Sequence, residues 1–128
     1  MRTTLFISLI LLGLGAASTA HATGPTCAQE ATRMLDATAK ADYPAARSDM
    51  DGFMLMMFSA DTLKANWDAI EEKYGAYRSH GKPDASTDKD GGTTVRIPLE
   101  FAKGHPTAVI LCRPPDEHGT KLGSFALI

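Results

Sequence analysis

Several features that would indicate a specific chemistry are missing from this 128-residue sequence. It has two cysteines but no CxxC motif, four histidines but no HExxH motif, and neither an internal repeat nor a low-complexity tract. Its 13 basic residues form no run and are slightly outnumbered by 15 acidic ones. Because nucleic-acid binding draws on clustered cations that release counterions from phosphates, we expect no nucleic-acid partner.

The one long apolar stretch, residues 5–17, lies near the N terminus and is typical of a cleavable signal peptide. Arg2 precedes it and the small residues Ala20 and Ala22 follow it, so the pattern predicts a signal peptide over residues 1–22. The stretch covers about 13 residues, whereas a membrane-spanning helix needs roughly 20. We therefore expect a periplasmic or secreted protein with one domain, residues 23–128. Loss of Arg2 changes its formal net charge from −2 to −3.

Export determines how the two cysteines, Cys27 and Cys112, are interpreted. A lipid anchor on Cys27 is an alternative, but about ten residues separate it from the apolar stretch, so we expect no membrane attachment after cleavage. A disulfide can persist in an oxidising compartment. Closing a loop of this length would stabilise the fold by about 4 kcal/mol. No histidine neighbours either cysteine, so a disulfide is favoured over a reactive thiol.

The N-terminal half of the mature chain predicts helices, over residues 27–41, over 44–50 after Pro44, and from a cap at Ser59 or Asp61 to Gly75. The last of these has an apolar stripe at helical spacing, formed by Leu63, Trp67, Ile70 and Tyr74. Residues 53–58 are apolar at every position, so periodicity does not distinguish helix from strand, and we expect them in the core.

The C-terminal half predicts strands. Residues 95–102 alternate apolar and polar side chains, and Pro98 among them indicates an edge strand or a bulge. Shorter strands are expected over residues 77–82, 107–113 and 121–127, with an exposed loop over residues 83–92. Short turns favour an antiparallel meander. We thus expect an α+β fold in which N-terminal helices pack on a curled three- to four-stranded antiparallel sheet, with Cys27 bonded to Cys112.

The sequence resembles a domain of unknown function found in exported bacterial proteins, alone or ahead of α/β-hydrolase domains. The residues that carry this resemblance are Leu63, Trp67, Ile70, Tyr74, Gly75 and Tyr77, the strand VRIPLEFAKG, and Gly119, Lys121, Leu122, Gly123 and Phe125. The resemblance implies a cystatin-like or nuclear transport factor 2-like cone fold. These are core and turn residues, so no catalytic role is carried over. No hydrolase domain follows Ile128, so hydrolase activity is not expected.

Four methionines, Met50, Met54, Met56 and Met57, suggest a Cu(I) site because thioethers bind that ion, but their neighbour Phe53 favours core packing. The acidic loop residues Asp84, Asp88 and Asp90 suggest calcium, but the EF-hand register fails, because Ile97 would stand where a bidentate Glu is needed. A solvated loop is therefore predicted. We expect the histidines at the surface; they are His80, His105 and His118. Ser124 lacks the glycine pair of a nucleophile elbow and is expected in a strand. No metal site is predicted.

We expect a binding module rather than an enzyme, with no cofactor, and with a protein partner, a second copy or a small apolar ligand. Cone folds often hold a pocket between helix and sheet. Candidate pocket residues are Trp67, Tyr74 and Tyr77, and candidate partner-surface residues on the outer sheet face are Arg78, Arg96 and Glu100. The alternatives are an enzyme or an accessory domain to a secreted hydrolase, and a periplasmic Cu(I)-binding protein.

Overall fold

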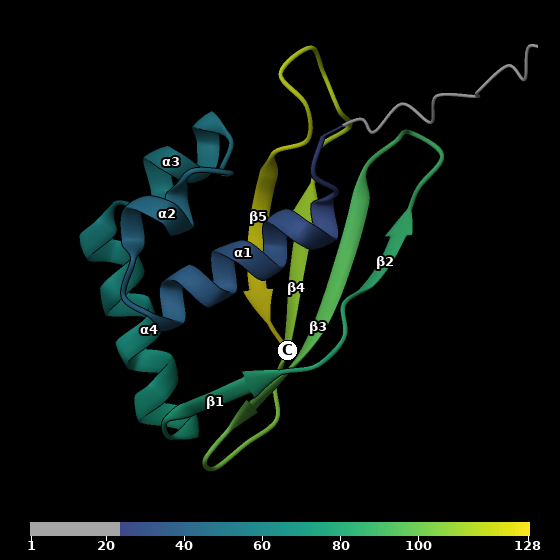
Figure 1. The fold of residues 1–128 in the computed structure, drawn as a ribbon. Coiled ribbons are helices and arrows are strands. Elements are labelled where there is room, and N and C mark those ends of the chain that lie inside the picture. The colour runs from purple at the N-terminus through teal and green to yellow at the C-terminus, as the bar shows by residue number, and fades with distance from the viewer. Residues whose placement is uncertain (1–23) are drawn as a thin grey trace, which may run out of the picture.

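The computed structural model describes residues 24–128, and in these residues four helices cover one face of an antiparallel sheet of five strands (Figure 1). The helices come first in the chain and the strands follow, because apolar residues at helical spacing give way to alternating ones after Gly75. The predicted α+β class is confirmed. The predicted signal peptide, residues 1–22, lies outside the described residues.

The four helices are α1 (Cys27–Ala39), α2 (Tyr43–Arg47), α3 (Gly52–Met57) and α4 (Ala60–Tyr74). A side-chain oxygen caps the N terminus of each one, from Thr26, Asp42, Asp51 and Ser59 respectively. Such caps satisfy N–H groups that have no partner within the helix. Gly75 ends α4 as predicted, with a positive φ of 81° that favours glycine.

The five strands are β1 (Tyr77–His80), β2 (Asp84–Thr87), β3 (Thr93–Phe101), β4 (Thr107–Cys112) and β5 (Leu122–Leu127). Their order is β1-β3-β4-β5, and β2 pairs with the same side of β3 as β1. The exposed loop predicted for residues 83–92 is wrong in part, because β2 lies within it. All four β2 residues are exposed, so no apolar alternation marked the strand in the sequence.

Pro98 explains why β1 and β2 are two strands instead of one. The edge alternative predicted for Pro98 is wrong, because β3 is paired on both sides. The ladder is nevertheless irregular there, as the bulge alternative predicted: residues 81–83 face only residues 97–98 of β3. Leu99 N–H donates to Pro106 on the β4 side, so the missing N–H of Pro98 falls on the β1 and β2 side. The chain turns there at Gly81, which donates to the Pro98 carbonyl at 2.8 Å. A Cβ on Gly81 would lie 2.7 Å from Pro98 Cγ, so glycine is required.

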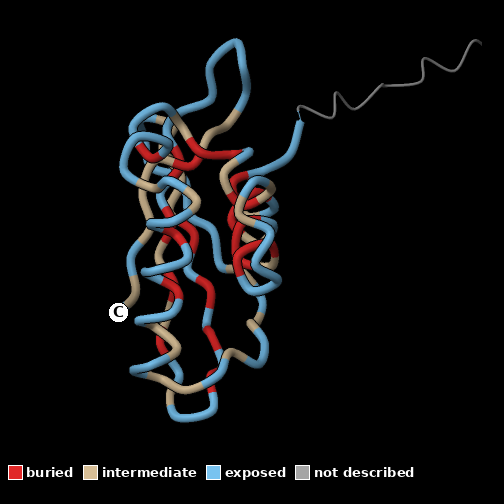
Figure 2. The backbone as a smooth tube through the Cα atoms, turned by 90° about the vertical axis from the view of Figure 1, so that its left-hand side faces the viewer, coloured by how far each residue is buried: buried red, intermediate tan, exposed pale blue. Residues whose placement is uncertain are grey.

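The core lies between α1, α4 and the inner face of β3 and β4. The predicted alternation in β3 is confirmed, because its four inward side chains are at most 2% exposed; they are Val95, Ile97, Leu99 and Phe101. Ala31, Met34 and Leu35 of α1 pack over this face. Figure 2 shows buried positions gathered in α1 and the strands that it covers, while only Leu63 and Trp67 of α4 are buried.

The predicted disulfide is confirmed: Cys27, the first residue of α1, is bonded to Cys112, the last residue of β4, with their Cα atoms 6.0 Å apart. It closes a loop across 85 positions of the sequence. Both residues are buried, so the bond joins helix to sheet from within the core.

Replacing both cysteines by serine is expected to lower the free energy of unfolding by about 4 kcal/mol, because the unfolded chain regains the freedom of the closed loop. Urea denaturation of the variant and the oxidised wild type measures the difference. Wild-type protein kept reduced is the control and should lose a similar amount. Equal stability of the oxidised and reduced forms would contradict the role assigned to the bond.

Candidate functional site

The three aromatic residues predicted to lie near a pocket meet in the structure, but around a core residue. Trp67, Tyr74 and Tyr77 surround Phe101, with ring centroids 5.8, 5.7 and 5.4 Å from its own. Trp67 and Tyr77 also pack edge to face at 5.4 Å. Such edge-on pairs add to the stability that area burial provides. Of these three, only Trp67 also lines the apolar pocket described next.

An apolar pocket of about 40 Å³ lies between α1, α4 and β5. Methionines from three segments, Met34, Met50 and Met54, line it together with Trp67 and Phe125. Pockets for small-molecule ligands usually measure about 300–1,000 Å³, so this one has room for one apolar side chain rather than a whole ligand. Methionine is flexible and fills irregular gaps, so the pocket can adapt to the group that enters.

The segment 53–58 was expected in the core, and this prediction is wrong for most of it. It forms helix α3, in which only Met54 is buried. Phe53 is 55%, Met56 79% and Met57 55% exposed. These three residues are spaced i, i+3 and i+4 and therefore share one side of the helix, which we call the α3 face. Sequence reasoning missed this surface because an all-apolar segment shows no polar side to point outward.

Hydrogen bonds at both ends hold α3 in place. At its start, the Asp51 carboxylate accepts from Met54 N–H, and Asp51 N–H donates to the Leu122 carbonyl at 2.8 Å. At its end, the Arg47 guanidinium donates to the carbonyls of Phe58 and Leu55 at 2.8 and 3.3 Å. Terminal carbonyls that have no partner within the helix are thus satisfied. The α3 face is held toward solvent by this anchoring.

The structure separates the four methionines that suggested a Cu(I) site. Met50 and Met54 are buried, as predicted for core residues, while Met56 and Met57 are exposed, which corrects that prediction for them. The four sulfurs therefore do not share one face. Within residues 24–128, no group of three His, Cys, Asp or Glu side chains is arranged to hold a metal ion.

One of the acidic residues in the β2–β3 segment, Asp88, stabilises the turn between the two strands. Asp88 Oδ1 accepts from the N–H groups of Asp90 and Gly92 at 2.8 and 3.0 Å, which stabilises a tight turn between the strands. Asp84 lies apart from this turn, paired with Arg96 across the β2–β3 ladder.

The three histidines lie apart from one another, each beside a different carboxylate. His105 and His118 are exposed, as predicted, beside Glu100 at 2.7 Å and Glu117 at 3.4 Å. The surface prediction holds only in part for His80, which is half-buried: its side chain is 21% exposed and lies 3.0 Å from Asp36 of α1. Ser124 lies within β5, as predicted, and pairs with Leu111 of β4.

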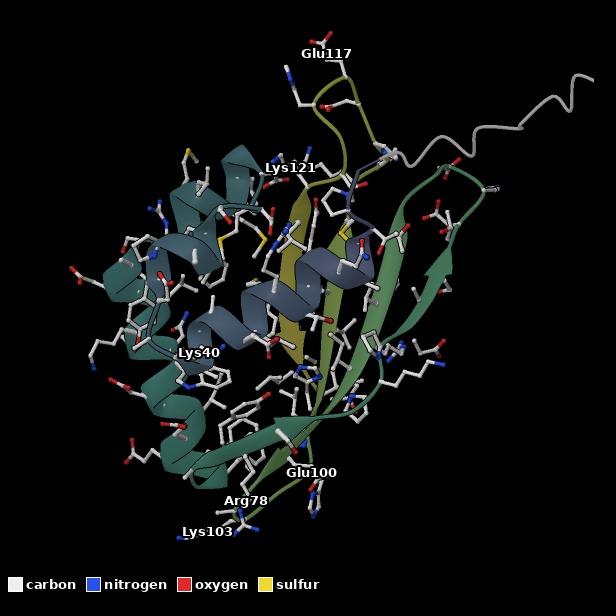
Figure 3. The ribbon with its side chains drawn as sticks, in the orientation of Figure 1. Lys40, Arg78, Glu100, Lys103, Glu117 and Lys121 are labelled. Carbon is white, nitrogen blue, oxygen red and sulfur yellow. A yellow bond between two sulfur atoms is a disulfide. The ribbon has the colours of Figure 1, made fainter. Side chains whose placement is uncertain are left out.

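The candidate partner-surface residues are exposed residues of β1 and β3. Arg96 and Glu100 alternate with the buried residues of β3 and so lie on the outer sheet face, while Arg78 is exposed on β1. Figure 3 shows Arg78 and Glu100 close to Lys103, at the end of the sheet opposite the loop that carries Glu117. The ion pair of Glu100 with His105 is exposed and therefore contributes little stability.

A buried carboxylate that the sequence did not predict lies in the first turn of α1. Glu30 is only 3% exposed, and its Oε2 atom has no hydrogen-bond partner. Burial, the largest cause, and nearby Asp49 together raise the pKa of Glu30 from 4.5 to about 7, against the opposing effects of Lys121 and Arg33. Asp49 itself is paired with Arg33 at 2.7 Å. An acidic residue in a first turn is common at a helix surface, so its sequence position gave no sign of burial.

No family model, curated protein or solved structure matches this chain. The resemblance to the exported domain family, and the cone fold that it implies, therefore stay predictions. Among residues 24–128 no helix is long and apolar enough to cross a membrane.

The exposure of α3 leads to a paired stability prediction. Met54→Ala should lower the free energy of unfolding by about 2–5 kcal/mol, because it opens a cavity in the core. Met56→Ala should change it by no more than about 0.5 kcal/mol, because its side chain is exposed. Chemical denaturation of both variants measures the contrast. Equal losses in the two variants would show that the α3 face is packed against the domain in solution.

Glu30 leads to a prediction about pH. Its pKa is raised from 4.5 to about 7 on folding, so the folded state holds its proton more tightly. The stabilising contribution is therefore full below about pH 4.5 and is lost as pH rises through about 7. Glu30→Gln, which stays neutral, should remove this loss and be more stable than wild type at pH 8. Denaturation curves at several pH values test this, and parallel pH profiles of the two proteins would refute it.

Proposed function

We propose that this protein is an exported, non-enzymatic binding domain that recognises a protein partner through the α3 face. Its place is the periplasm or the extracellular space. The observation that carries the proposal is the exposure of Phe53, Met56 and Met57 on one side of a helix that is anchored at both ends. Large apolar side chains gathered at one exposed site are typical of surfaces that bind other proteins.

The chemistry of the α3 face suits a protein partner. Aromatic residues and methionine are enriched in protein interfaces, and methionine adapts to the shape of what it contacts. Met54 and Phe58, which belong to or adjoin α3, line the apolar pocket, so the pocket lies beside α3, although none of the three residues of the α3 face lines it. A partner bound at the face would therefore have an apolar recess next to it.

Two features support an exported location. Residues 1–22 have the sequence pattern of a signal peptide, and the Cys27–Cys112 disulfide is of a kind that persists in oxidising compartments. A role as an accessory domain to a secreted hydrolase is a special case of the same proposal, in which the hydrolase is the partner. The size of the pocket favours a protein side chain over a free apolar ligand.

The test is site-specific crosslinking from two positions. A photoreactive benzophenone amino acid replaces Met56 in one variant and Glu72, an exposed residue of α4, in the other. Irradiation of cells that export the protein should give a discrete protein adduct from position 56 and none from position 72. The adduct should disappear when Phe53→Ser is added, since that change removes an apolar contact from the same face.

Mass spectrometry of the adduct identifies the partner, and a second copy of this chain would define the binding as self-association. Absence of an adduct, or equal adducts from positions 56 and 72, would overturn the proposal. Each variant must first show the thermal unfolding of the wild type, so that loss of the adduct is not loss of the fold.

A further inference from the structure

The last strand of the sheet, β5, has an outer edge with unused backbone groups. Thr107 and Ile128 exchange both of their backbone hydrogen bonds, at 2.8 and 3.0 Å. In an antiparallel ladder such pairs alternate, so the registers place the N–H and C=O groups of Phe125 and Leu127 on the side away from β4. Helix α4 on that side offers no backbone partner, because its own groups bond within the helix.

One end of this edge already accepts a neighbouring chain segment. Leu122 N–H donates to the Asp49 carbonyl and Asp51 N–H donates to the Leu122 carbonyl, both at 2.8 Å. Met50 thereby pairs with Leu122 in a parallel bridge. The chain then turns away into α3, so the pairing stops after one residue. The edge beyond Leu122 continues without a neighbour from the described part of the chain.

A shallow groove, widely open to solvent, runs along the free part of the edge, between β5 and α4. Its volume is about 300 Å³, and it is bordered by Asn66, Ala69 and Ile70 of α4 and by Phe125 and Leu127 of β5. Four of the residues that line it also line the apolar pocket; they are Phe58, Asn66, Ile70 and Phe125. The groove therefore joins a free strand edge to an apolar recess.

We propose that an extended segment of the partner protein adds to the sheet as a strand beside β5 and places one apolar side chain in the methionine-lined pocket. Strand addition of this kind gains affinity from main-chain hydrogen bonds and specificity from pockets for alternate side chains. Phe125 and Leu127 supply the main-chain groups, and the pocket lies beside them. The pairing of Met50 with Leu122 shows that this edge accepts a parallel neighbour.

An extended chain fits this place better than a second folded copy. If two copies paired edge to edge through β5, the α4 helix of one copy would have to occupy the space beside β5 where the α4 helix of the other copy lies. A single strand needs only about 4.8 Å beside β5. This inference rests on the proposed function, since it names the form in which the partner binds.

Amide hydrogen exchange, followed residue by residue by NMR, tests the inference on the wild-type mature protein. The probes are capped heptapeptides with alternating sequences of Val and Thr, Leu and Ser, and Met and Ser. Such generic sequences serve because main-chain pairing tolerates sequence variation, and they are used at millimolar concentration. In the free protein, Phe125 and Leu127 amides should exchange quickly and Ser124 and Ala126 amides slowly. At least one probe should slow Phe125 and Leu127 by tenfold or more. The same peptide with every backbone nitrogen methylated should have no effect.

Two results would overturn the inference. The first is free protein in which Phe125 and Leu127 are as protected as Ala126, because the edge would then already be covered. The second is a full set of probes that leaves exchange at Phe125 and Leu127 unchanged. If that second result came with a specific adduct from position 56, the α3 face would still bind a partner, and only strand addition would be excluded. Protection at β5 without any adduct would instead exclude the α3 face and retain the edge.

Discussion

The structure depends on the attachment of α1 to the middle of the sheet. Ala31, Met34 and Leu35 pack on the buried side of the central strands, and the Cys27–Cys112 bond fixes the start of the helix to the end of β4. With α1 over the centre, the remaining helices lie toward the β5 edge (Figure 1). These helices cover less of the sheet than α1 does. Apolar side chains that a complete helical layer would bury therefore stay at the surface or line the pocket.

The segment between α2 and α3 links this arrangement to the α3 face. Its backbone pairs with Leu122, its Asp51 carboxylate caps α3, and its Asp49 carboxylate pairs with Arg33 of α1. The α3 face, the pocket and the free edge of β5 are therefore held by one set of contacts around residues 49–51. Buried Glu30 of α1, whose pKa is raised to about 7, lies near Asp49, so a charge next to this segment changes near neutral pH.

Strong periodic signals in the sequence were enough to predict the frame of the fold. Three signals can be recognised from residue type and spacing alone. They are the alternation in β3, the apolar stripe of α4 and the cysteine pair. The strand β2 escaped prediction because all four of its residues are exposed and show no apolar alternation, and the split at Pro98 depends on the residues that face it. The α3 face escaped because an all-apolar segment does not show which residues stay exposed. The burial of Glu30 is likewise set by tertiary packing.

Helix α3 presents an apolar face to solvent on a folded domain. This exposure is measured by NMR of methionine methyl groups labelled with carbon-13, in the presence of a soluble paramagnetic agent. The signals of Met56 and Met57 should broaden strongly and those of Met50 and Met54 only a little, in line with their exposed fractions of 79%, 55%, 3% and 1%. Equal protection of all four methyl groups in dilute protein would contradict it.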